Sequence, residues 1–221
     1  SLSSPLFAVA TSSTAKPFFQ IASSTAIIID GGVTQPTHKG SLTDGTGGAL
    51  LSGAHSVFVS GNYAYIASAG SNALEIVDVS NPSAPVHKGS ITSGTSGALL
   101  STPHGIFVNG NYAYITVFGS NALEIVDVSN PSVPVHKGSL LHGVGGALLS
   151  QPRSIFVSGN YAYIVSTGSS ALEIIDVSNP SAPVHKSSLS NGTGGALLST
   201  PHSIFVSGNY AYIASAGSNA L

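Results

Sequence analysis

The chain contains no cysteine, no methionine and no tryptophan, and only 6% of its 221 residues are charged. Without cysteine it can form neither a disulfide framework nor a thiolate metal site, so cysteine pairing gives no indication of its compartment. Methionine is missing even at residue 1. Such a start is typical of a processed chain, and we therefore expect export followed by removal of a signal segment, with an extracellular or cell-surface location.

The scarcity of charge also excludes nucleic acid as a partner. Six basic residues against eight acidic ones give a net charge of −2, too little positive charge for the phosphate contacts that drive nucleic-acid binding. No stretch approaches the roughly 18 consecutive apolar residues of a membrane span. Hydrophobic residues still make up 42% of the chain, so a large core is expected beneath a surface rich in Ser, Thr, Asn and Gly.

What the chain does contain is a strict repeat. Four leucines lie 49 residues apart, and four glycines follow the same spacing. They are Leu74, Leu123, Leu172, Leu221, Gly61, Gly110, Gly159 and Gly208. A fixed period of this length predicts one continuous stack of similar units.

Each unit contains four short segments rich in β-branched and aromatic residues, which predict four strands. In the second unit these are 56–59, 63–67, 74–79 and 86–91. Gly61 and Asn62 favour a tight hairpin between the first two, and Pro82 with Pro85 interrupts the ladder before the fourth. The first three segments carry apolar residues on both faces, which requires sheets packed against sheets.

Short four-stranded units at this spacing are typical of β-propeller blades. We predict an all-β propeller of four-stranded antiparallel blades, with four blades and half of a fifth in one domain, 1–221. The expected blades cover about 5–48, 49–97, 98–146, 147–195 and, in part, 196–221.

The two terminal units differ from the others. The first has drifted: Leu6–Ala10 is expected as its first strand and Ser23–Ser24 as a tight turn. The fifth stops at Leu221, where its third strand should begin. This predicts either a fragment of a longer closed propeller or a half blade that a second copy completes.

Residues Leu74–Asp78, reading Leu-Glu-Ile-Val-Asp, are followed by Val-Ser-Asn-Pro-Ser-Ala-Pro. This stretch resembles the LVIVD repeat, a β-propeller family of bacterial and archaeal secreted or surface proteins. The resemblance covers nearly the whole chain and implies an extracellular scaffold or binding surface, with no shared catalytic residues. In the first unit Ile29 stands where the motif has its acid, Asp78.

The charged residues recur with the repeat, as Glu75, Asp78 and Lys88 do in the second unit. We expect Asp78 to lie near His87 or Lys88 across the ladder, or to accept backbone N–H groups of the turn that follows it. One histidine series, which includes His87, is expected at the periphery on the fourth strands. Acids spread over separate blades do not form a paired-carboxylate site.

A second histidine series, His55, His104 and His202, precedes the innermost strands, with Arg153 in the fourth unit. Three histidines could bind zinc only if their circle were narrow, so hydrogen bonds to neighbouring loops are favoured, and no metal or cofactor is predicted. The tyrosine pairs, such as Tyr63 with Tyr65, are expected to pack between blades rather than stack on sugars. The Gly-rich connections lack the lysine and helix of a phosphate loop.

The sequence thus favours a non-catalytic extracellular module that binds other copies of itself or cell-surface proteins. An unpaired strand edge templates strand addition, and the predicted interaction edge is Tyr210, Ala211, Tyr212, Ile213 and Leu221. Self-association through it would build a surface assembly, or a filament if the symmetry does not close. Two alternatives stay open: a lectin-like propeller that binds glycans at one site per blade, and a fragment of a longer propeller. An enzyme would need a metal, for which the sequence offers only the three histidines.

Overall fold

The computed structural model describes residues 21–22, 25–26 and 37–221. In this part of the chain the structure is β throughout, apart from four short 3-10 turns. Three sheets have four strands each, in the sequential order that a meander gives, and all pairings are antiparallel. The all-β propeller architecture predicted from the repeat is therefore confirmed for the second to fourth blades.

The strands of the second blade are β3 (Ala54–Ser60), β4 (Tyr63–Ser68), β5 (Ala73–Asp78) and β6 (Val86–Thr92). Those of the third are β7 (Pro103–Asn109), β8 (Tyr112–Val117), β9 (Ala122–Asp127) and β10 (Val135–Leu141). Those of the fourth are β11 (Pro152–Ser158), β12 (Tyr161–Ser166), β13 (Ala171–Asp176) and β14 (Val184–Ser190). The fifth unit contributes β15 (Pro201–Ser207) and β16 (Tyr210–Ser215).

Of the first unit, the structure describes two short strands, β1 (Ile21–Ala22) and β2 (Thr25–Ala26), which pair antiparallel. The predicted strand Leu6–Ala10 and the turn Ser23–Ser24 lie outside the described residues. In the complete blades, the turn between the first two strands has the predicted form. Gly61 takes a positive φ of 57° between Ser60 and Tyr63, which pair with each other.

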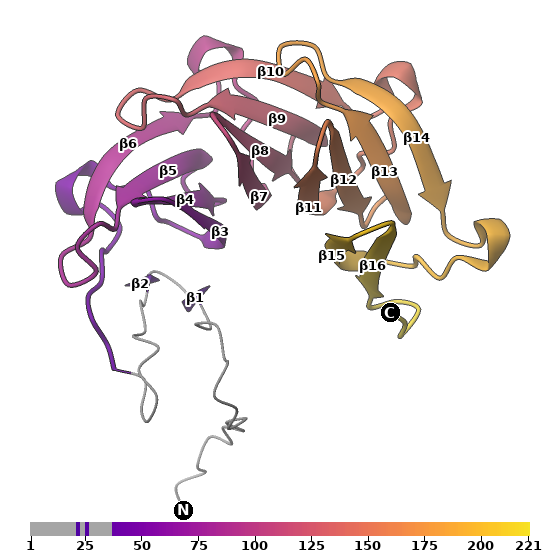
Figure 1. The fold of residues 1–221 in the computed structure, drawn as a ribbon, viewed down its shortest axis with the longest axis horizontal. Coiled ribbons are helices and arrows are strands. Elements are labelled where there is room, and N and C mark those ends of the chain that lie inside the picture. The colour runs from indigo at the N-terminus through magenta and orange to yellow at the C-terminus, as the bar shows by residue number, and fades with distance from the viewer. Residues whose placement is uncertain (1–20, 23–24, 27–36) are drawn as a thin grey trace, which may run out of the picture.

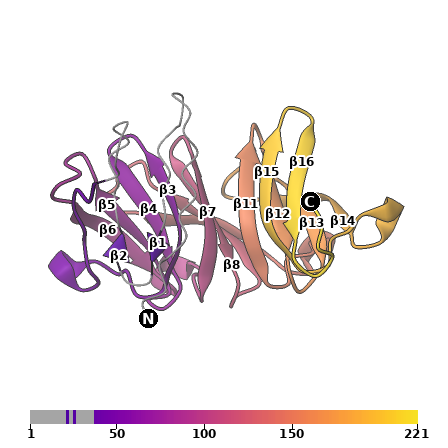
Figure 2. The ribbon, with the colours of Figure 1, turned by 90° about the horizontal axis from the view of Figure 1, so that it is seen from below.

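The blades are arranged as an open arc (Figure 1), with β3, β7, β11 and β15 side by side along the inside and β6, β10 and β14 on the outside. Figure 2 shows β15 and β16 beside β11 and β12 at one end. One phenylalanine from each inner strand forms a row: Phe58, Phe107, Phe156 and Phe205, with ring centroids 4.8, 5.0 and 5.2 Å apart. The innermost position of the first strands agrees with the prediction.

The core lies between neighbouring blades. Tyr114 on β8, for example, is only 4% exposed and belongs to one cluster with Ile155 and Val157 on β11. Tyr65 on β4 is 5% exposed and lies in the corresponding cluster with Ile106 of the next blade. These tyrosines pack between blades, as expected, and their rings are closed to a sugar.

Each blade is joined to the next by a Gly-rich connection that contains a 3-10 turn: η1 (Thr46–Gly48), η2 (Thr95–Gly97), η3 (Val144–Gly146) or η4 (Thr193–Gly195). The residue before each turn is a glycine with left-handed backbone, such as Gly45 with φ 80°. A side chain would be strained there, which explains the glycine. Among residues 37–221 no helix is long and apolar enough to cross a membrane.

A second glycine explains how closely the blades approach on the outside. A Cβ atom on Gly89 of β6 would lie 2.4 Å from the carbonyl oxygen of Pro131, in the turn between β9 and β10. Gly138 has the same relationship to Pro180 of the fourth blade. In the fourth blade the equivalent residue is Ser187, which is exposed. The sequence therefore keeps a glycine where a neighbouring turn packs and replaces it where none does among the described residues.

Candidate functional site

A buried glutamate on the third strand of each complete blade binds two partners. Oε1 of Glu75 lies 2.6 Å from Nδ1 of His87 on β6, and Oε2 accepts the backbone N–H of Leu50 at 3.1 Å. The same arrangement joins Glu124 with His136 and Leu99, and Glu173 with His185 and Leu148. We call this three-part contact the clasp. It fastens the connection that enters a blade to that blade's third and fourth strands.

The clasp holds its acid away from water. The side chains of Glu75 and Glu124 are 0% exposed, and those of His87 and His136 about a quarter exposed. Burial raises the pKa of Glu75 and Glu124 above the usual range, and the hydrogen bond from the histidine counteracts that rise. A glycine of each connection, such as Gly48, faces the far edge of the imidazole. The arrangement therefore serves to fix the connection.

Of the two neighbours predicted for Asp78, the structure confirms Lys88 and corrects His87. A regular ladder would place Asp78 opposite His87, but the register shifts between Ile76 and Val77, so that Val77 pairs with His87 and Asp78 with Val86. Lys88 is the extra residue of this β-bulge. The shift brings His87 onto the face of the sheet that carries Glu75. The sequence carries no distinctive signal for the bulge, and the pairing with Glu75 was therefore missed.

Asp78 instead caps the turn that follows it. Its Oδ1 accepts the backbone N–H of Ser80 at 2.9 Å, as the alternative prediction stated. Hydrogen bonds from Ser80 lower the pKa of Asp78, and the nearby Lys88 adds a smaller effect in the same direction. Asp127 and Asp176 bind Ser129 and Ser178 in the same way.

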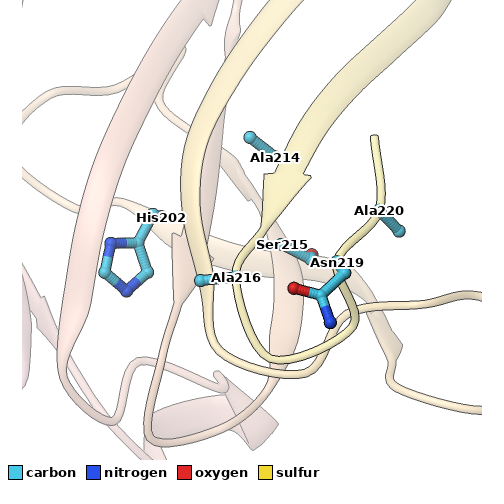
Figure 3. A pocket seen from close by; sticks show the side chains of 6 residues that line it. All are labelled: His202, Ala214, Ser215, Ala216, Asn219 and Ala220. Carbon is cyan, nitrogen blue, oxygen red and sulfur yellow. The ribbon is translucent and has the colours of Figure 1, made fainter.

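The inner histidines do not converge on one point. His55 and His104 are neighbours, with ring centroids 4.2 Å apart, and His104 also stacks on Phe118 at 4.9 Å. His202 instead lines a shallow hollow with Ala214, Ser215, Ala216, Asn219 and Ala220 (Figure 3). Among residues 37–221, no three His, Cys, Asp or Glu side chains are placed to hold a metal ion.

Arg153 occupies the position of this inner row that belongs to the fourth blade. Its guanidinium carbon lies 5.3 Å from the ring centroid of Phe118, and its Nε donates to Oγ1 of Thr167 at 2.9 Å. Burial, together with the smaller effects of the nearby His55 and Arg153, lowers the pKa of His104 to about 4. The imidazole of His104 is therefore neutral at physiological pH.

The residues of the predicted interaction edge lie at the C-terminal end of the arc. Tyr210, Ala211, Tyr212 and Ile213 belong to β16, which pairs on one side with β15. Apart from a single bridge between Ser215 and Ala220, its other side has no strand partner among the described residues. Tyr210 is 70% and Leu221 90% exposed. This edge is the largest difference between the fifth unit and the complete blades.

The sequence of the blades matches the model of a known protein family. The model of the LVIVD repeat matches residues 53–93, 103–141, 151–190 and 201–219, more than half of the chain. The chain belongs to the LVIVD repeat family. The first two matches end within or next to a connection that a clasp fastens, those that enter the third and the fourth blade.

Solved structures show the same fold at low sequence identity. A functionally unknown protein from Desulfotomaculum acetoxidans is 16% identical with a TM-score of 0.64, over 87% of this chain and 56% of the other. The β-propeller domain of Cps50 (Swd1) from Myceliophteria thermophila is 10% identical with a TM-score of 0.57, over 81% and 55%. A Bacteroides uniformis protein with the provisional name 6-phosphogluconolactonase is 14% identical with a TM-score of 0.65, over 86% and 56%.

This LVIVD repeat chain spans little more than half the length of each of these structures. At such identities the likeness shows the propeller fold alone. No protein with a curated description matches the chain.

Proposed function

We propose that this LVIVD repeat propeller is a non-catalytic interaction module, exposed at the cell surface or secreted, that associates with other copies of itself through the open edge of β16. The observation that carries the proposal is the exposure of side chains that are covered in complete blades. Tyr212 is 48% exposed, whereas its equivalents Tyr65 and Tyr114 are 5% and 4% exposed. Phe205, at the end of the phenylalanine row, is 59% exposed.

The open edge of β16 is suited to strand addition, in which a further strand pairs with the edge of a sheet. β4, β8 and β12 each pair on this side with a third strand, in a register that joins Tyr65 to Ile76 and Tyr114 to Ile125. An added strand satisfies the open backbone groups of β16, and a second copy that also packs against this face would cover Tyr212, as the next blade covers Tyr65 and Tyr114. Self-association would supply both without a further protein.

Ser187 limits which segment of a second chain can pair with β16. A complete fifth blade of the usual form would bring a proline carbonyl to within 2.4 Å of a Cβ at this position, as the contact of Gly138 with Pro180 shows. A single strand at β16, without the following turn, avoids that clash. Pairing of β16 with β16 of a second copy is then a closed, two-fold arrangement, whereas pairing with a different segment gives open-ended growth.

The test is sedimentation velocity of the 221-residue chain over a range of concentrations. Tyr212→Lys places a charge on the edge, and we expect it to shift the chain to monomers. The matched control is Val184→Lys on β14, because Val184 is also exposed, at 59% against 48% for Tyr212, but lies on an outer strand. A wild-type chain that stays monomeric at every concentration would falsify self-association. If both variants weaken association equally, the contact between copies does not lie at the edge of β16.

The other hypotheses predict different results. A longer natural chain that supplies the missing strand itself would show a higher intact mass and a monomer. Glycan binding by tyrosine is expected at Tyr210 or Tyr212, which are exposed, whereas the tyrosines of the complete blades are buried or partly buried. Protease treatment of intact cells tests the location: a surface protein is cleaved while a cytoplasmic marker is not.

A further inference from the structure

The first two strands of the third blade, the loop after them and the first strand of the fourth blade depart from the repeat at four positions that lie together. Arg153 replaces histidine, Gly105 replaces serine, and Thr116 and Phe118 replace smaller or apolar residues. The equivalents are His55, His104 and His202 for Arg153, Ser56, Ser154 and Ser203 for Gly105, Ala67, Val165 and Ala214 for Thr116, and Ala69, Thr167 and Ala216 for Phe118. In a chain of near-identical units, such a group of changes points to a local requirement.

Contacts connect these four changes. Oγ1 of Thr116 accepts the backbone N–H of Gly105 at 2.8 Å and donates to the carbonyl oxygen of Arg153 at 3.0 Å. A Cβ at residue 105 would lie 2.5 Å from that carbonyl and 2.8 Å from Oγ1, so the threonine requires the glycine. Phe118 supplies the ring over which the guanidinium lies. Three of the changes thus hold the fourth, Arg153, in place.

Among residues 37–221, Arg153 has no carboxylate partner. Its described hydrogen bond runs from Nε to Thr167, which leaves both terminal nitrogens without a hydrogen bond or ion pair within residues 37–221. Strands β3, β4, β7, β8, β11, β12, β15 and β16 contain no Asp or Glu, because the acids of the described blades lie on β5, β9 and β13 and in the first connection, as Asp44. Arg153 is partly buried, and removing a charge from water costs free energy that pairing with an anion offsets.

We propose that Arg153, held against the ring of Phe118, forms a binding site for an oxyanion, a carboxylate or phosphate group, at the inner end of the third and fourth blades. Arg153 is the permanent cation, since arginine does not deprotonate in proteins, and its planar fork matches either group with two parallel hydrogen bonds. The site lies where the connection and the loop after the second strand meet, and it does not depend on the open edge of β16.

The experiment is calorimetric titration of the full chain with inorganic phosphate and, separately, with acetate, against sodium chloride at matched ionic strength. We expect saturable binding of at least one oxyanion at millimolar concentration. Arg153→His restores the residue of the other blades, so the fold is retained, and it should weaken binding at least about tenfold. Thr167→Ala, which copies Ala69 and Ala216, should weaken it less, because the guanidinium loses only its anchor.

Lys186→Gln is the matched control, because it removes a cation from the outer strand β14 of the same blade. It should leave binding unchanged. Binding of phosphate alone assigns the site to phosphoryl ligands, and binding of acetate assigns it to carboxylates. No response beyond that to sodium chloride, or equal binding by wild type and Arg153→His with intact folding curves, would overturn the proposal.

Discussion

The backbone N–H of Leu99 donates a hydrogen bond to Oε2 of Glu124, 25 residues further along the chain, at 3.1 Å. This single contact links the connection that enters the third blade to that blade's third strand. Oε1 of the same carboxylate binds His136 on the fourth strand at 2.6 Å. One fully buried carboxylate therefore determines the relative position of three segments, and its loss should destabilise the whole blade.

Replacing Glu124 by alanine leaves the N–H of Leu99 and Nδ1 of His136 without a partner in the interior. We expect the free energy of unfolding to fall by about 3 kcal/mol, measured by urea denaturation. Glu124→Gln keeps an acceptor for Leu99 and should cost about 1 kcal/mol. Asp127→Asn, at an exposed turn, is the control and should change little. Equal stability of wild type and Glu124→Ala would contradict a structural role of the clasp.

The strands of the second to fifth units could be predicted because the repeat presents the same turns and apolar segments again and again. Gly61 and the prolines after Asp78 mark their boundaries. The clasp could not be predicted, because it depends on the bulge at Lys88, and a one-residue shift in register moves His87 to the other face. The contact between Phe118 and Arg153 is equally hidden, since it joins changes in two different units.

The difference between Gly138 and Ser187 predicts opposite outcomes for reciprocal substitutions. Gly138→Ser forces a Cβ against the carbonyl of Pro180 and should lower the free energy of unfolding by about 2 kcal/mol through overpacking. Ser187→Gly meets no such neighbour and should cost less than about 1 kcal/mol, through backbone entropy alone. Thermal and urea unfolding of both variants would check this. Equal losses of unfolding free energy in the two variants would mean that the turn of Pro180 is free to move away.

Ser170 offers a stabilising change. Its equivalents Asn72 and Asn121 have left-handed backbone and accept the N–H of Thr102 and Gln151 at 2.8 and 2.7 Å. Ser170 has the same backbone, φ 48°, but bonds to Thr167 instead. Ser170→Asn should gain about 1 kcal/mol in unfolding free energy, and Asn121→Ser should lose a similar amount. If both substitutions raise the unfolding free energy, or both lower it, the prediction is wrong.

The lowered pKa of His104 predicts a pH dependence of stability. Burial first, and then His55 and Arg153, lower its pKa from 6.5 to about 4 in the folded chain. Between these values the unfolded chain binds a proton that the folded chain does not. The stability associated with a neutral His104 is thus fully present above pH 6.5 and decreases as the pH falls towards 4. Glu75 and Glu124, whose pKa values are raised, act in the opposite direction.

Comparison of wild type with His104→Gln separates these effects, because both chains keep the same glutamates. The difference in unfolding free energy should move in favour of the variant as the pH falls from 6.5 towards 4. NMR titration of the His104 ring gives the pKa directly, and Arg153→Gln should raise it, since one nearby cation is removed. A difference curve that stays flat over this range, with a ring that titrates near 6.5, would show that His104 is open to water in solution.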